Sequence, residues 1–248
     1  MSERNRLRSI FTLVLLNGLI PIRTTPLYIV NLLASPLSFL FFIYIVSHGT
    51  YVAYGITGGM VLTMLTVGTS LQSDLTHYRH DLKFQDVVVA SPVEAPIYVA
   101  GMALSELVYS LPALGVFVVL FFVWGFASVT SLVVLAGVLV LVWSFASALA
   151  FTLATYFQDV RETFIFSPMI SLLFTVLPPV YYPITALPAW AQVAARISPT
   201  TYAAELVQGA VGLQPISFSG AVVDWAVLIA FTVVLFAVAA VKARWREP

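Results

Sequence analysis

The stretch PVYYPITALPAWAQVAARISPTTYAAELVQGAV, at residues 179–211, decides how the rest of the sequence is interpreted. Long apolar stretches precede and follow it. Its prolines and polar residues keep it from spanning a bilayer, and it is too apolar for a plain solvated loop. Irregular backbone of this kind is stable at a membrane only where other parts of the protein cover it. The stretch therefore predicts a bundle of membrane helices around it.

The composition indicates an all-α membrane protein. Of its 248 residues, 60% are hydrophobic and 9% are charged, whereas soluble domains contain about 25% charged residues. The net charge is zero, so the sequence shows no basic footprint for nucleic acid. The chain has no cysteine, which excludes disulfides, thiolate metal sites and cysteine nucleophiles.

Six stretches have the roughly 20 mostly apolar residues that a transmembrane helix needs. They are Leu27–Ser47, Tyr51–Leu71, Ile97–Val123, Val129–Thr155, Thr163–Tyr182 and Val222–Val241. Six spans place ten of the eleven Lys and Arg residues on one side, and only Arg196 on the other. The positive-inside rule then puts both termini in the cytoplasm. We interpret residues 1–248 as one transmembrane domain in the cell membrane.

The N-terminal residues 1–26 are predicted to form an amphipathic helix on the cytoplasmic membrane surface. Arg4, Arg8 and Thr12 recur at four-residue spacing and make a polar stripe along this helix. A signal peptide is the weaker alternative, because Asn17 and Gly18 interrupt the apolar run and no cleavage site follows.

Residues 73–96 form a long polar cytoplasmic loop between the second and third spans. The stretch Asp81–Ala90 is predicted to be a short helix with two partly apolar stripes, which Ser91 and Pro92 end. A short helix that projects from a bundle suits docking into a groove of a soluble partner. A solvated loop that lies on lipid headgroups is the alternative.

The histidines of this loop do not make a strong metal site. His77 and His80 lie close to Asp74 and Asp81, a spacing that could hold a metal on a helix. A third strong ligand is missing, so solvated histidines are the favoured interpretation.

The sequence also lacks HExxH, a Ser-His-Asp arrangement and the GxxxxGK[ST] phosphate loop. If ATP drives this protein, another chain binds it.

Few polar residues lie inside the predicted spans. Glu106 is the only acidic residue deep in a span, which makes it a functional candidate. It could serve a proton- or ion-coupled carrier, or pair structurally with a serine or tyrosine such as Ser105, Tyr109 or Ser110. Asp224, near the end of the last span, is expected to reach water. Gly55 and Gly59 form a GxxxG pattern, a common signal for close helix packing.

Two short helices are predicted within the opening stretch. Leu187 and Pro188 begin the first, whose apolar positions include Trp190. Ser198 and Pro199 end it and begin the second, which runs to Val211. We expect residues 183–212 to dip into the outer leaflet and return as a re-entrant pair.

Two segments give the chain a resemblance to the membrane subunits of ABC-2 type exporters. The stretch LKFQDVVVASPVEAPIYVAGMALS, at residues 82–105, resembles the coupling helix and the following span of that family. Residues 179–211 resemble its outer signature, with Leu-Pro at the first short helix and Pro199 with Tyr202 at the second. Many relatives place an arginine soon afterwards, whereas this chain has Glu205 and Gln208 there.

The resemblance implies three groups of functional residues. Contact with an ATPase subunit is expected at Asp81, Leu82, Lys83, Phe84, Asp86, Asp159, Arg161 and Glu162. An outer gate is expected at Pro183, Leu187, Pro188, Trp190, Pro199 and Tyr202. Pathway-lining candidates, which could equally be core residues, are Phe39, Phe42, Met64, Phe174 and Tyr181.

The resemblance also implies partners. Two copies of an ATP-binding-cassette subunit would bind ATP and Mg, and a second copy of this chain or a sister permease would complete the pathway in membrane lipid. This chain would hold no cofactor, no metal and no catalytic residue of its own. Its cargo would be amphipathic: a drug-like compound, a lipid or a lipid-linked glycan. A secondary carrier that uses Glu106, or a static membrane scaffold, are the alternatives.

Overall fold

A computed structural model describes residues 3–24, 27–83, 88, 90, 93–157, 159–175 and 178–242. These residues form helices, turns and loops, with no strand among them, which confirms the all-α class. The helices are α1 (Glu3–Val14), α2 (Ile20–Thr24), α3 (Leu27–Val46), α4 (Val52–His80), α6 (Ala95–Val123), α7 (Val129–Ala154), α8 (Val160–Thr175), α9 (Ala189–Ala195), α10 (Pro199–Ala210) and α11 (Phe218–Lys242). A π-helical segment, Leu15–Leu19, joins α1 to α2.

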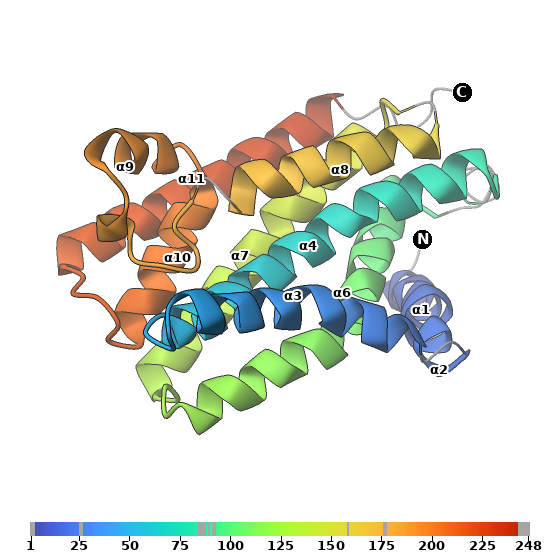
Figure 1. Ribbon diagram of the computed structural model, residues 1–248. Coiled ribbons are helices and arrows are strands. Elements are labelled where there is room, and N and C mark those ends of the chain that lie inside the picture. Colours follow the sequence, from blue (N-terminus) through green and yellow to red (C-terminus); the bar gives the residue numbers. More distant parts are fainter. Residues whose placement is uncertain are drawn as a thin grey trace.

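The long helices run along a common direction with α4 among them (Figure 1). The short helices α9 and α10 lie at one end of this bundle, which we call the α9 end. The other end carries α1, together with the last residues of α4, α7 and α11, and we call it the α1 end. The alternation of the long helices between the two ends agrees with a multi-pass membrane protein.

Five helical stretches among the described residues are long and apolar enough to cross a membrane. They are Arg6–Thr24, Val52–His80, Pro96–Val123, Val129–Ala154 and Phe218–Lys242. The last four contain the predicted second, third, fourth and sixth spans almost entirely. The 20 residues of α3 coincide with the predicted first span. Within α3, only the shorter stretch Leu37–Val46 qualifies as an apolar helix, so α3 is not counted among the five. The count of six spans therefore stays a prediction.

The predicted fifth span, Thr163–Tyr182, is wrong in its second half. Helix α8 has 16 residues and ends at Thr175, and residues 178–183 are not helical. Pro178 and Pro179 explain the difference, because a proline lacks the backbone donor of a helix and disfavours helical geometry at the residue before it.

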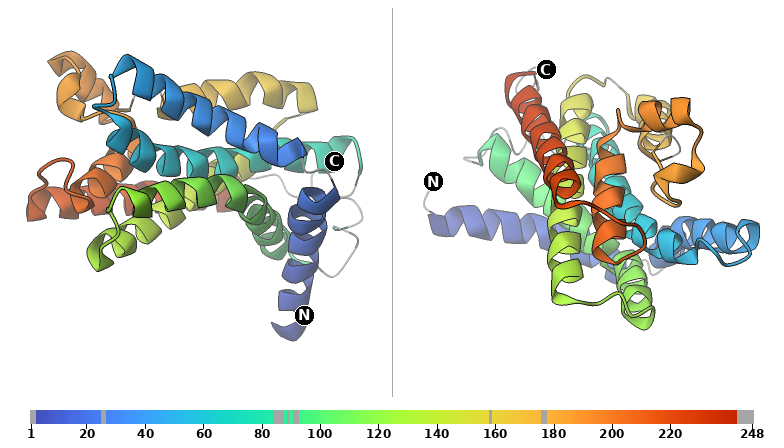
Figure 2. Two further views of the ribbon diagram at one scale, coloured as in Figure 1. Left: turned by 60° about the horizontal axis from the view of Figure 1, so that its bottom comes forward. Right: turned by 90° about the vertical axis from the view of Figure 1, so that its left-hand side faces the viewer.

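The N-terminal helix runs across the bundle rather than along it (Figure 2). It packs against the first turns of α6, where Leu13 lies against Gly101 and the Ser105 hydroxyl donates to the Leu13 carbonyl at 3.1 Å. An ion pair of 3.0 Å joins Arg6 to Glu94. This direction supports the predicted location on the membrane surface, although the length and composition of Arg6–Thr24 would also suit a span.

Helix α4 is longer than predicted and continues to His80. The residues after Leu71 were expected to be a polar loop, but Leu71 and Leu75 are buried and Gln72 and Thr76 face the interior with them. This part of α4 was predicted to be a loop because polar side chains usually indicate contact with water. Here they are enclosed by neighbouring helices instead.

Glycines let α4 approach its neighbours closely. A Cβ at Gly58 would lie 2.2 Å from the Val180 carbonyl oxygen, and one at Gly68 would lie 2.4 Å from the Ala146 Cβ of α7. Gly55 lies against α3 and Gly59 against Phe117 of α6. The GxxxG pattern thus permits close packing as predicted, but its two glycines serve two different helices.

The close approach at Gly68 predicts a specific loss of stability. Gly68→Ala forces a methyl group against Ala146 and the Trp143 carbonyl, which should lower the free energy of unfolding by about 1–3 kcal/mol. Thermal unfolding of the purified chain in lipid nanodiscs measures this. Gly115→Ala in α6 is the matched control, because none of the described residues lies within 4 Å of the added Cβ. Equal effects of both variants would contradict the packing argument.

Candidate functional site

At the α1 end the structure joins the last residues of α4 to the residues 155–157, which precede the second segment predicted to contact an ATPase. The Arg79 guanidinium donates from Nη1 to the Thr155 carbonyl at 3.0 Å, and His80 donates from Nε2 to the Phe157 carbonyl at 2.9 Å. The last carbonyls of a helix have no partner within it, so cationic and polar side chains stabilise them. The end of α4 is therefore fixed to the link between α7 and α8.

The helix predicted over Asp81–Ala90 does not begin at Asp81. The Asp81 amide bonds to the His77 carbonyl and closes α4, and Leu82 and Lys83 are not helical. Lys83 has a φ of 51°, in the left-handed region. All three side chains are exposed. Of the other predicted contact residues in this loop, Phe84 and Asp86 lie outside the described residues.

The link between α7 and α8 is held on several sides. The Asp159 carboxylate accepts from the Arg161 amide at 2.9 Å, the Phe157 ring stacks on Phe166, and the Tyr156 hydroxyl donates to the Lys242 carbonyl of α11 at 2.8 Å. Glu162 lies in the first turn of α8. The sequence prediction missed the parts of Arg79, His80 and Tyr156, because their acceptors are carbonyls far away along the chain.

His77 and His80, both in the last turn of α4, have separate partners. His77 pairs through Nδ1 with the Asp81 carboxylate at 2.7 Å, while His80 bonds to a carbonyl. Among the described residues no group of three His, Cys, Asp or Glu side chains is placed to hold a metal ion.

Glu106 is buried between α6 and α4. The Ser70 hydroxyl donates to its Oε2 at 2.6 Å, and the Asp74 carboxyl of α4 lies nearby. The partner is a serine of a neighbouring helix, as the structural interpretation of the sequence expected, whereas the Ser105 and Ser110 hydroxyls bond to backbone carbonyls. Glu106 therefore connects two helices.

At the α9 end the predicted pair of short helices is present. Pro188 precedes α9 as its N-cap, and Pro199 is the first residue of α10. Hydrogen bonds fix the pair to the bundle, from Thr200 to the Phe174 carbonyl at 2.8 Å and from Gln208 to the Val180 carbonyl at 3.2 Å. Its entry into a membrane leaflet stays a prediction.

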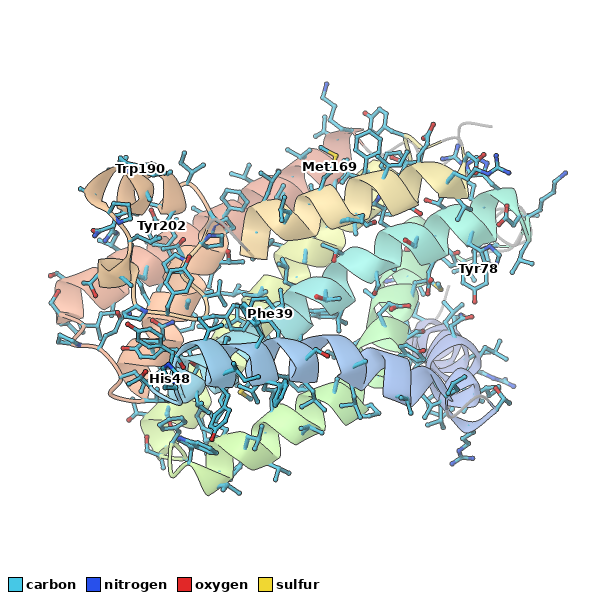
Figure 3. All side chains as sticks on the ribbon, in the orientation of Figure 1. Phe39, His48, Tyr78, Met169, Trp190 and Tyr202 are labelled. Carbon is cyan, nitrogen blue, oxygen red and sulfur yellow. The ribbon has the colours of Figure 1, made fainter. Side chains whose placement is uncertain are left out.

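The predicted gate residues divide into exposed and buried members. Trp190 is 76% exposed at the outside of α9 (Figure 3). Tyr202 is part-buried, and its hydroxyl donates to the Arg196 carbonyl at 2.8 Å. Pro199 is buried, Pro183 and Leu187 are intermediate, and Pro188 is exposed. The exposed face of α9 continues through Val193 and Ile197.

The five pathway candidates do not form one surface. Phe39 of α3 and Tyr181 are in ring contact, with centroids 4.2 Å apart, and Phe42 lies beside Phe39 at 6.5 Å. Phe174 packs instead on the core residue Phe145. Met64 is 2% exposed and belongs to the core of the chain, the alternative that the sequence left open for these residues.

One ion pair lies in the short-helix region. Arg196 and Glu205 approach to 3.7 Å, and the Glu205 side chain is 12% exposed. Burial raises the pKa of Glu205, and the guanidinium of Arg196 partly opposes this rise. Glu205 receives its positive partner from the end of α9.

The sequence profile of the ABC-2 type transporter family matches residues 10–212. The chain belongs to this family. The matched range begins within α1 and ends after α10, so it includes the contact segments of the α1 end and the short helices of the α9 end. A comparison with curated proteins found no match. The chain is thus a multi-pass permease of the ABC-2 type.

The raised pKa of Glu205 predicts a pH dependence of the permease's stability. The folded state binds the Glu205 proton more tightly than the unfolded state, so stability falls as pH rises above the ordinary value of 4.5 through the raised pKa. Glu205→Gln should remove this loss, and Arg196→Gln should increase it. Unfolding midpoints measured from pH 4 to pH 8 test this. A wild-type profile unchanged by Glu205→Gln would contradict the assignment.

Proposed function

We propose that this chain is the transmembrane permease subunit of an ABC exporter. It couples ATP hydrolysis by a separate ATPase subunit to export or flipping of an amphipathic substrate, such as a drug-like compound, a lipid or a lipid-linked glycan. ATP and Mg are bound by the two ATPase subunits, and a second copy of this chain or a sister permease completes the pathway. The α1 end faces the cytoplasm.

One observation carries the proposal: a single helix, α4, contacts both the link next to the second predicted coupling segment and the region that holds the short helices. At the α1 end it is joined to the link 155–157 through Arg79 and His80. Near the α9 end, Gly58 lies against the Val180 carbonyl, which also accepts from Gln208 of α10. Displacement of α4 by an ATPase would therefore act directly on the short helices.

The exposed faces of α3 and α8 support a partner permease. Both helices present large apolar side chains, including Phe41 and Phe42 on α3 and Met169 and Leu172 on α8. Both lie beside α4, on the same side of the bundle. A second subunit placed there would enclose a pathway next to the Phe39–Tyr181 contact, while membrane lipid would cover the remaining apolar faces.

The docking part of the proposal is tested with the candidate ATPase. The chain is co-expressed with an ABC ATPase, purified in lipid nanodiscs and assayed for ATP hydrolysis. Combined charge reversal at Asp81, Lys83 and Asp86 should reduce the co-purified ATPase by about tenfold or more, because charges are reversed across a docking interface.

Lys242→Glu is the control for this reversal. It changes the charge at the same end of the bundle, on an exposed residue of α11 outside the predicted contact segments. If the control lowers binding as much as the loop reversal, or if the loop reversal has no effect, the docking proposal is wrong.

A secondary carrier that uses Glu106 is the second candidate, and its burial beside Asp74 is the observation in its favour. The permease proposal gives Glu106 a structural part instead. Glu106→Gln can still accept from the Ser70 hydroxyl, so transport driven by ATP should persist. Glu106→Leu removes this hydrogen bond between α4 and α6, which should lower the free energy of unfolding by about 1 kcal/mol.

Transport assays in liposomes, with and without ATP, separate the two candidates. Loss of transport in a folded and assembled Glu106→Gln variant would favour the carrier. Gradient-driven transport without any ATPase would favour it as well.

A further inference from the structure

A cavity of about 680 Å³ lies at the α9 end, away from the α3 and α8 faces that were assigned to a partner. Its walls come from the start of α4, residues 183–185, the end of α9, α10, the loop 213–217 and the first turns of α11. The volume is within the range of small-molecule sites, roughly 300–1,000 Å³.

The cavity is held in place by contacts of its walls. The Tyr54 hydroxyl donates to the Leu213 carbonyl at 2.8 Å, and the Leu213 amide donates to the Gln208 carbonyl at 2.9 Å. Gly209 lies directly under Ile216, where an added Cβ would be 2.6 Å from its Cγ2. The loop between α10 and α11 is therefore fixed at both sides of the cavity.

Three charged side chains line this cavity, two carboxylates and one guanidinium. Arg196 approaches Glu205 to 3.7 Å and also acts on Asp224, so the two carboxylates share one positive charge and the lining has an excess of negative charge. Asp224 is only 5% exposed, so it reaches the cavity rather than the open surface. Among the described residues none donates a hydrogen bond to its carboxylate. A buried carboxylate without a donor is costly unless a cationic group joins it.

The lining favours an organic cation over a metal ion. No group of three potential metal ligands exists among the described residues, and the space is far larger than a bare ion needs. The hydroxyls of Thr185, Ser217 and Ser219 line the same cavity and can accept from N–H groups. Tyr54 is the single aromatic residue of the lining, whereas quaternary ammonium groups are held by aromatic cages.

We propose that this cavity binds a primary ammonium group, with Asp224 as its counter-ion. The group belongs to an amine-bearing lipid headgroup or to a soluble amine. The first turns of α11 continue from the cavity as an exposed apolar surface that contains Phe218, Val222 and Val223. The acyl chains of a lipid such as phosphatidylethanolamine can lie along this surface while its amine reaches Asp224. The site does not depend on an ATPase or on the proposed transport.

The test compares primary with quaternary amines on the full-length chain. In one arm, the unfolding midpoint of the chain in phosphatidylcholine nanodiscs is measured with ethanolamine or choline in solution. In the other, nanodiscs contain phosphatidylethanolamine, its N,N-dimethyl form or phosphatidylcholine alone, and native mass spectrometry counts the retained lipid. We expect ethanolamine or phosphatidylethanolamine to bind more tightly than its methylated counterpart.

Asp224→Asn should weaken this binding about tenfold or more, because it removes the negative partner of the ammonium group. Glu94→Gln, which removes a carboxylate at the α1 end, should leave it unchanged.

Binding in the solution arm alone identifies a soluble amine, and binding in the lipid arm alone identifies a headgroup. Equal binding of primary and quaternary amines overturns the proposal. So does an absence of binding in both arms, which can be measured on the wild-type chain even if Asp224→Asn does not fold.

Discussion

The close packing of α4 is the constraint on which the rest of the structure depends. Its glycines bring it against α3, α6, α7 and the segment around Val180 at distances that no larger residue permits. A helix in contact with so many neighbours cannot move alone, because protein interiors are close-packed and transmit strain. Every proposed movement of this permease therefore either carries α4 with it or takes place outside its contacts.

The two ends of α4 differ in how they are held. At the α1 end, the Arg79 and His80 side chains bond to carbonyls, and such contacts can exchange for water or for a partner protein. Near the α9 end, backbone lies on backbone at Gly58, and Gln208 fastens the same carbonyl. The polar layer of Ser70, Asp74 and Glu106 lies between them and joins α4 to α6. An adaptable contact thus faces the proposed ATPase, and a rigid one faces the short helices.

Local signals could be predicted from the sequence, and long-range ones could not. The starts of the two short helices could be predicted from Pro188 and Pro199, because proline favours the first turn of a helix through its own backbone geometry. The bounds of α6 and α7 followed from apolar length. The extension of α4 was missed because Gln72 and Thr76 look like loop residues, although the folded chain buries them. Ser70 as the partner of Glu106, and Asp224 as a cavity wall, are products of tertiary contacts that no spacing encodes.

The burial of α4 has a consequence for how the protein is made. Among the long helices of the bundle, α4 is the most enclosed and is less apolar than α6, α7 and α11. During synthesis it emerges before all three of them, so its polar residues and glycine surface first meet lipid, which accommodates them poorly. The packing of α4 therefore depends on helices that are made after it, and nascent chains that stop before α7 should be prone to degradation.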